Sequence, residues 1–266
     1  MDARSSMLNS ETWVDRAKVP VVITLVFWII KILATTVGET AADFLAVDLH
    51  FGLGGTSWVM GSLLALTLAA QMRARRYIPW LYWLTVVLVS VVGTLLTDNI
   101  TDHAGVPLDI TTTLFALALL ATFIAWYARE RTLSIHSIYT ARREAFYWAA
   151  ILFTFALGTA AGDLAAERLQ WGYAHSALLF GAALGVVALA HFGFKANAVA
   201  AFWAAYILTR PFGATCGDWL SKSAAEGGLG LGTVATSALF LLVIAGLVLH
   251  LTLTRRDAAP GAVGTG

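Results

Sequence analysis

Acidic side chains occur inside stretches of the chain that are otherwise apolar. Five of them stand out: Glu39, Asp43, Asp98, Asp163 and Asp218. A carboxylate inside a membrane helix costs about 3 kcal/mol on insertion scales, and it persists mainly where it faces a cavity, a charged partner or a transport pathway. Because clustered carboxylate oxygens favour hard cations such as Mn²⁺, Mg²⁺ and Ca²⁺, the acids are our first candidates for chemistry.

The four aspartates belong to a fixed pattern of Trp, nine residues, Gly, four residues, Asp. It occurs four times, at Trp28, Gly38, Asp43; Trp83, Gly93, Asp98; Trp148, Gly158, Asp163; and Trp203, Gly213, Asp218. Successive glycines are 55, 65 and 55 residues apart, so the two halves of the chain match at an offset of 120. The spacing indicates a two-helix unit that was duplicated, and a pair that was duplicated again.

The elements that must position these residues are membrane helices. The 266 residues are 59% hydrophobic and only 12% charged, which excludes a soluble globular domain. The apolar runs are too long for strands of an outer-membrane barrel. We expect eight transmembrane helices, near residues 20–46, 56–72, 78–101, 108–128, 145–166, 173–194, 198–220 and 229–253. A formal net charge of +1 implies no nucleic-acid partner, and a single cysteine excludes a disulfide framework.

The basic residues predict the orientation. Thirteen of them fall on one face: Arg4, Arg16, Lys18, Arg73, Arg75, Arg76, Arg129, Arg131, Arg142, Arg143, Lys195, Arg255 and Arg256. Only Arg168 and Lys222 fall on the other. The positive-inside rule therefore places both termini in the cytoplasm and the protein in the bacterial inner membrane. Residues 1–19 then form a cytoplasmic lead, not a cleaved signal peptide, and 254–266 a disordered cytoplasmic tail.

Each repeat contains two spans, so successive repeats enter the membrane from the same side. We expect four parallel repeats, over about 20–76, 77–143, 144–196 and 197–253, within one all-α membrane domain at 20–253. The odd-numbered helices carry the polar residues and should be central. The even-numbered helices should lie outside them, against lipid.

The repeated pattern resembles a bacterial membrane family of four tandem repeats of unknown function, with two transmembrane helices and a tryptophan in each repeat. The resemblance covers about residues 20–253 and rests on Trp28, Trp83, Trp148 and Trp203. It implies the eight-helix architecture and no activity.

The candidate cation site extends beyond the four aspartates. Glu39 lies four residues before Asp43, and Asp102 and Glu167 lie four residues after Asp98 and Asp163, so each pair should share one helix face. In the fourth repeat Lys222 takes that position, and we expect it to neutralise its own Asp218. Thr97 and the neighbouring hydroxyls of Thr40, Thr94, Thr159 and Thr215 are candidate secondary ligands. The alternative is that the acids merely cap helix ends.

Two bases lie inside the spans, Lys31 and Arg210. They either pair with Glu39 or an aspartate and balance the charge of the site, or bind an anion; Arg210, which precedes Pro211, is also a candidate gate. Five buried acids against two buried bases leave three negative charges, which suits a cation or protons. The repeated glycines either allow close helix packing or, near Pro211, break a helix and expose carbonyls.

The remaining motif residues carry weaker signals. The tryptophans lie about 15 Å from their glycines, so they indicate membrane anchors or packing wedges. A weak metal site near the outer surface is one interpretation of His50, His103 and His175 with Asp48, Asp102 and Asp109. Solvated loop residues are the alternative and explain these side chains equally. Cys216 could add a soft ligand near Asp218.

Together these observations predict an inner-membrane transporter of a small cation, a divalent metal ion such as Mn²⁺, with proton exchange as a means of coupling. A cation channel and a non-transporting scaffold or sensor are alternatives. No catalytic or nucleotide-binding spacing occurs, so we expect neither an enzyme nor a cofactor. The expected partners are lipid, the cation and protons, with a homo-oligomer left open.

Overall fold

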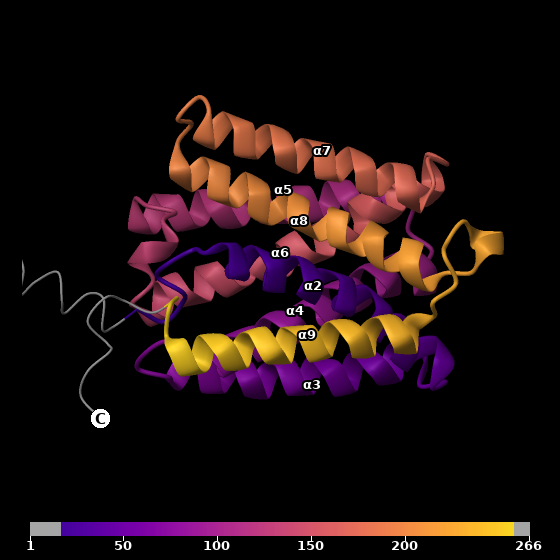
Figure 1. Ribbon diagram of the computed structural model, residues 1–266, viewed down its shortest axis with the longest axis horizontal. Helices are drawn as coiled ribbons and strands as arrows, with labels where there is room; N and C mark the ends of the chain where they lie inside the picture. Colours follow the sequence, from indigo (N-terminus) through magenta and orange to yellow (C-terminus); the bar gives the residue numbers. More distant parts are fainter. Residues whose placement is uncertain (1–16, 258–266) are drawn as a thin grey trace, which may run out of the picture.

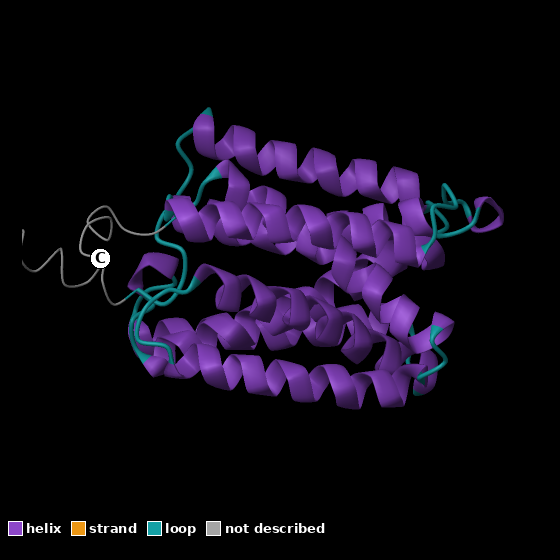
Figure 2. Ribbon diagram, turned by 60° about the horizontal axis from the view of Figure 1, so that its bottom comes forward, coloured by secondary structure: helices purple, strands orange, loops and turns teal. Residues whose placement is uncertain are grey.

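The computed structural model describes residues 17–257, and its regular elements are all helical in that range (Figure 2). The long helices are α2 (Leu25–Asp43), α3 (Gly52–Arg73), α4 (Pro79–Asp98), α5 (Leu108–Glu130), α6 (Ala141–Asp163), α7 (Tyr173–Phe192), α8 (Ala198–Ser221) and α9 (Thr233–Thr254). Short π-helical turns follow at η1 (Phe44–Asp48), η2 (Asn99–His103) and η4 (Leu164–Arg168), and 3₁₀ turns at η3 (Ile135–Ser137) and η5 (Ala224–Glu226).

Local sequence signals start and stop these helices. The side chains of Thr24, Thr140 and Asn197 accept hydrogen bonds from the first backbone N–H groups of α2, α6 and α8. Pro79 opens α4, where its missing N–H costs nothing. The helix bounds agree with the eight expected spans to within a few residues. Seven helical spans are long and apolar enough to cross a membrane, whereas α8, which contains Arg210 and Asp218, is not among them.

The four helices that carry the motif form a closed inner ring. Helix α2 packs against α4 and α8, and α6 packs against the same two helices from the other side (Figure 1). The inner spans of α2, α4 and α6 are 61–72% buried, against 11–22% for the spans of α3, α5, α7 and α9. The expected arrangement, with odd-numbered spans inside and even-numbered spans outside, is therefore present in the structure.

Each outer helix packs on the inner helix of the following repeat. Helices α3, α5 and α7 lie against α4, α6 and α8, and α9 at the end of the chain returns to cover α2. The two ends of the described chain meet at the same end of the bundle, where the backbone N–H groups of Val21 and Val22 donate to the carbonyl of Asp257. The ring is thus closed by the first and last repeats.

The motif glycines let neighbouring inner helices approach closely. A Cβ atom at Gly38, Gly93, Gly158 or Gly213 would overlap the residue three positions before the glycine of the next inner helix: Ser90, Phe155, Arg210 and Thr35, respectively. The same contact therefore recurs four times around the ring, as small residues at a helix interface allow. Helix α8 continues through Pro211, so of the two interpretations of the glycines close packing is confirmed and the alternative, a broken helix at Pro211, is wrong.

The motif tryptophans pack inside the bundle. Trp83, Trp148 and Trp203 are buried with Tyr82 and Tyr147 in one core cluster. Their rings meet neighbouring aromatic rings at centroid distances of 5.0–6.2 Å. Packing wedges explain these three residues, and membrane anchors do not.

The expected cytoplasmic lead and disordered tail lie partly outside the described residues, which exclude 1–16 and 258–266. The described part of each is ordered. The Lys18 ammonium pairs with Glu144 at 2.7 Å, and the carboxylate of Asp257 accepts a hydrogen bond from the hydroxyl of Tyr77 at 2.5 Å. Disorder from residue 254 onward is therefore wrong for the residues up to 257.

Candidate functional site

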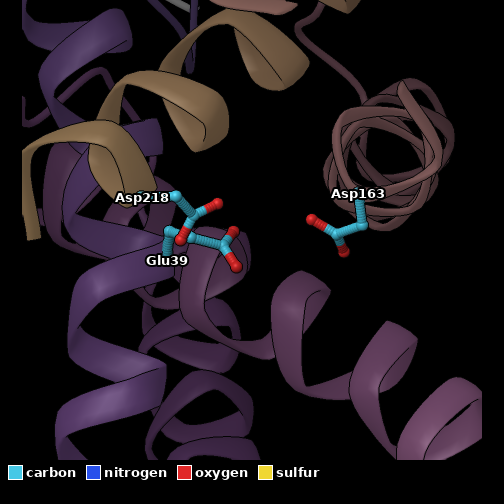
Figure 3. Close-up of side chains that lie close together, drawn as sticks. All are labelled: Glu39, Asp163 and Asp218. Carbon is cyan, nitrogen blue, oxygen red and sulfur yellow. The ribbon is translucent and has the colours of Figure 1, made fainter. Parts of the chain in front are cut away.

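Three carboxylates converge inside the ring, from three different inner helices. Oxygen atoms of Glu39 on α2, Asp163 on α6 and Asp218 on α8 all lie within 4.8 Å of one another. Figure 3 shows the carboxylates of Glu39 and Asp218 side by side, with Asp163 pointing toward them from across the ring. The side chains of Glu39 and Asp218 are buried, and that of Asp163 is partly exposed. The described residues hold no other such group of metal-binding side chains.

The repeat places Asp163 and Asp218 at one depth, with Glu39 about one helical turn before it, and the helix geometry changes after the motif aspartates. In the first three repeats the α-helix passes into a π-helical turn directly after the motif aspartate, at Asp43, Asp98 and Asp163. Such π turns are rare in proteins, and those that occur are often found at functional sites. In the fourth repeat α8 stays α-helical past Asp218 and ends at Ser221. The fourth aspartate is therefore held in a different setting.

Arg210 occupies the centre of the ring, beside the carboxylates. It is fully buried, and its Nη2 donates to the Glu39 carboxylate at 3.2 Å, to Thr159 at 2.6 Å and to Thr94. Its other N–H groups donate to the backbone carbonyls of Thr35 at 2.9 Å and Phe155 at 3.3 Å.

The three side chains that accept hydrogen bonds from Nη2 of Arg210 occupy the same position in their repeats, directly after the motif glycine. Arg210 thus joins α8 to the other three inner helices at one depth. The expected pairing of Arg210 with Glu39 is confirmed.

Lys222 pairs across the bundle. Its ammonium lies 3.0 Å from the carboxylate of Asp43, and no ion pair links it to Asp218 in the described structure. The expected pairing within the fourth repeat is therefore wrong, because the helix ends at Ser221 and Lys222 adopts an extended conformation that turns it toward α2. Burial disfavours its charge, but the carboxylates of Asp43 and Asp218 outweigh this and hold the pKa of Lys222 above its ordinary value.

Several predicted site residues lie outside the close group. Asp98 is near enough to interact electrostatically with Glu39 and Asp43, but it does not join the three converging carboxylates. Asp102 and Glu167 are exposed; Asp102 accepts a hydrogen bond from Thr101, and Glu167 accepts one from Tyr173. Asp102 and Glu167 therefore lie outside the close group, although each is near enough to its motif aspartate to interact with it electrostatically.

The hydroxyls and the second base also differ from expectation. Thr97 donates to the backbone carbonyl of Ala156 at 2.9 Å, so it links α4 to α6 and does not face the carboxylates. Lys31 contacts no carboxylate and instead lies against aromatic rings, so its expected pairing with an acid is wrong. Cys216 is partly buried and outside the close group. The histidines considered for an outer metal site, His50, His103 and His175, are exposed and form no cluster with the neighbouring acids within the part of the chain described.

The repeat pattern matches a known family along most of the chain. A family described as a repeat of unknown function (DUF347) matches residues 26–77, 81–132, 146–197 and 201–257. The chain belongs to the DUF347 repeat family. The suspected family of four tandem repeats is thereby confirmed. No curated protein and no solved structure matches the chain.

Two buried polar groups of this DUF347 protein were not anticipated from its sequence. Tyr82 and Tyr147 form a buried hydroxyl pair at 2.6 Å. Glu144 is fully buried and accepts hydrogen bonds from Lys18 at 2.7 Å and Gln71 at 3.3 Å. The sequence does mark the position of the two tyrosines, because an aromatic residue directly precedes every motif tryptophan. No repeated pattern marks Glu144.

Proposed function

We propose that this protein crosses the cytoplasmic membrane eight times, with both termini in the cytoplasm, and transports a small cation. The candidate cargo is a divalent metal ion such as Mn²⁺, bound by Glu39, Asp163 and Asp218. Helix α8 is the eighth span in this proposal. Its charged residues face the other inner helices, so they do not prevent it from crossing the membrane.

One observation carries the proposal. Asp163 and Asp218 lie within 4.8 Å of Glu39, yet neither has a salt bridge or side-chain hydrogen bond to any described residue, while Arg210 neutralises only Glu39. Clustered carboxylates in a low-dielectric interior need a cation or protons to offset their repulsion.

The spacing suits a hard divalent ion. Oxygen ligands lie roughly 2.0–2.6 Å from Mg²⁺ or Ca²⁺, so two ligands on opposite sides of one ion are roughly 4–5 Å apart. The separations among Glu39, Asp163 and Asp218 fall within this limit. The ring of oxygen ligands without a close sulfur or imidazole favours Mn²⁺, Mg²⁺ or Ca²⁺ over copper.

Thermal stability and flux together test the proposal. The purified protein should gain thermal stability with one of a panel of divalent cations, because a bound ion stabilises the folded state by mass action. Asp163→Asn and Asp218→Asn should each remove this gain and abolish uptake by proteoliposomes. Asp102→Asn is the matched control, since Asp102 is exposed just beyond a motif aspartate, and it should leave both unchanged.

Two outcomes would favour the alternatives. Flux that neither saturates nor responds to a pH gradient would indicate a channel. A scaffold would be indicated if no cation changes the stability of the wild-type protein and Asp218→Asn nevertheless lowers that stability. The second alternative has structural support of its own, because the Arg210–Glu39 and Lys222–Asp43 pairs each join two inner helices.

A further inference from the structure

A second buried charge lies on the same axis, on the other side of Arg210 from the carboxylates. Lys31 is fully buried on α2, and its ammonium nitrogen has no hydrogen-bond acceptor among the described residues. The nitrogen lies 4.2 Å from the ring centre of Phe155 and 4.3 Å from that of Tyr206. Lys31 and Tyr206 occupy the same repeat position, three residues after the motif tryptophan.

The surroundings of Lys31 do not balance its charge. Contacts with two aromatic faces contribute about 2 kcal/mol or somewhat more when desolvated, whereas taking an ammonium out of water costs several kcal/mol. Arg210, which has the same sign, lies near the same ring, with its Cζ 5.4 Å from the ring centre of Phe155. The nearest buried carboxylate on its own helix is Glu39, and Arg210 already holds it.

We propose that Lys31 is the proton-binding group of the transport cycle. The inference rests on the proposed cation transport and adds to it the group that couples cation and proton movement. When a divalent cation occupies the three carboxylates, Lys31 loses one proton and becomes a neutral amine. When the cation leaves, the negative charges of Asp163 and Asp218 are no longer offset, and they favour uptake of a proton by the amine. Proton loss offsets one of the two positive charges that the ion brings into the bundle.

The groups that face this part of the ring are few. Helix α8 contributes Arg210 and Tyr206, α4 contributes Tyr82, and α6 contributes Tyr147. Helix α2 itself has two acidic groups, Glu39 and, farther from Lys31 at the end of the helix, Asp43, which pairs with Lys222. The outer helix α9, which packs on α2, has His250 as its titratable group, and His250 is exposed near the end of that helix.

The tyrosines suggest where the proton travels. Tyr206 has a buried hydroxyl with no hydrogen-bond partner in the described part of the chain. Tyr82 and Tyr147, hydrogen bonded to each other at 2.6 Å, lie about one helical turn closer to the end of the bundle that holds Asp257. A proton leaving Lys31 would therefore exit by the end that the basic residues assign to the cytoplasm.

The charge of Lys31 can be read in the unaltered protein. The chain has four lysines, so the side-chain ¹⁵N resonance of Lys31 is identified as the one that survives Lys18→Arg, Lys195→Arg and Lys222→Arg. In wild-type protein we expect this resonance to shift from ammonium to amine as Mg²⁺ or Ca²⁺ saturates the site. An ammonium signal that persists with the cation bound would overturn the inference.

Proton counting gives an independent test. Isothermal titration in buffers of different ionisation enthalpy should show about one proton fewer released per cation bound by Lys31→Met than by wild type, since the proton of Lys31 adds to any that the ligands themselves release on binding. Lys31→Arg should behave like Lys31→Met, because an arginine does not give up its proton. Lys31→Met should keep the cation-dependent gain in thermal stability, whereas the permanent charge of Lys31→Arg should reduce that gain.

The two proposals fail in different ways. A wild-type protein that binds no cation of the panel overturns the proposed function and this inference with it. Cation binding with an unchanged proton count in Lys31→Met overturns this inference alone. If the variants do not fold, the resonance of the wild-type lysine decides the question.

Discussion

Replacing Arg210 with methionine should destabilise the protein more than any other single loss of charge. The substitution keeps most of the side-chain volume but leaves Glu39 buried without its cation, and leaves Thr94 and Thr159 without their common donor. Removing one partner of a buried ion pair costs roughly 3–5 kcal/mol. Domains of about 150–250 residues lose roughly 2–4 °C of Tm per kcal/mol, so Arg210→Met should melt roughly 6–20 °C lower.

A double-mutant cycle measured by thermal unfolding in detergent tests the reasoning. Arg210→Met combined with Glu39→Gln should be more stable than the sum of the single losses predicts, because the second change removes the stranded charge. Arg142→Met is the control: Arg142 is 69% exposed and pairs with Glu130 at 3.6 Å, so its loss should cost at most about 1 kcal/mol. An Arg210→Met variant that melts within 2 °C of wild type, or strictly additive changes, would refute the buried pair.

Three further predictions concern packing, ligand choice and pH. Gly93→Ala and Gly213→Ala should each cost about 1–3 kcal/mol of stability in the same unfolding assay, because the added Cβ overlaps Phe155 or Thr35. Gly185→Ala and Gly246→Ala, on outer helices, place the added Cβ in open space and should be neutral or slightly stabilising. Equal effects at all four positions would contradict the close contact between inner helices. Thr97→Val should lower stability by about 1 kcal/mol and leave the cation-dependent gain in Tm intact, since its hydroxyl serves Ala156; loss of that gain would make Thr97 a ligand after all. Burial raises the pKa of Asp257 above its ordinary value of 3.8, so the folded state binds this proton more tightly than the unfolded chain does, and the stability it contributes is fully present below about pH 3.8 and lost as the pH rises through the folded pKa. The Tm of wild type should therefore fall as the pH rises through the folded pKa of Asp257, and the Tm of Asp257→Asn should fall less over the same pH range. An equal dependence of Tm on pH in the two proteins would show that folding does not change the pKa of Asp257.

The periodic residues of the chain predicted the inner ring. One polar depth repeated four times at fixed spacing requires the four motif helices to share an axis, and the glycines predict that they lie close together. The pairing of Arg210 with Glu39 follows from the same reasoning, because a chain of four repeats that closes on itself makes the first and last inner helices neighbours.

The errors arise where the helices depart from ideal geometry. Asp102 and Glu167 were placed in the site by counting four residues along an α-helix, but each lies in a π-helical turn at the exposed end of its inner helix and neither joins the close group. Lys222 was placed by continuing α8 beyond its actual end at Ser221. The solvation of Lys31 by two aromatic rings depends on contacts between distant segments, and no spacing in the sequence encodes it.

The packing of α9 on α2 bears on whether the chain can be divided. The last long helix of the described residues completes the wall around the first one. A chain cut between the second and third repeats would hold Glu39 and Lys31 in one fragment and Arg210 in the other. Each fragment would then bury a charged group without its partner from the other fragment, so separately expressed halves should become stable only by assembling with each other.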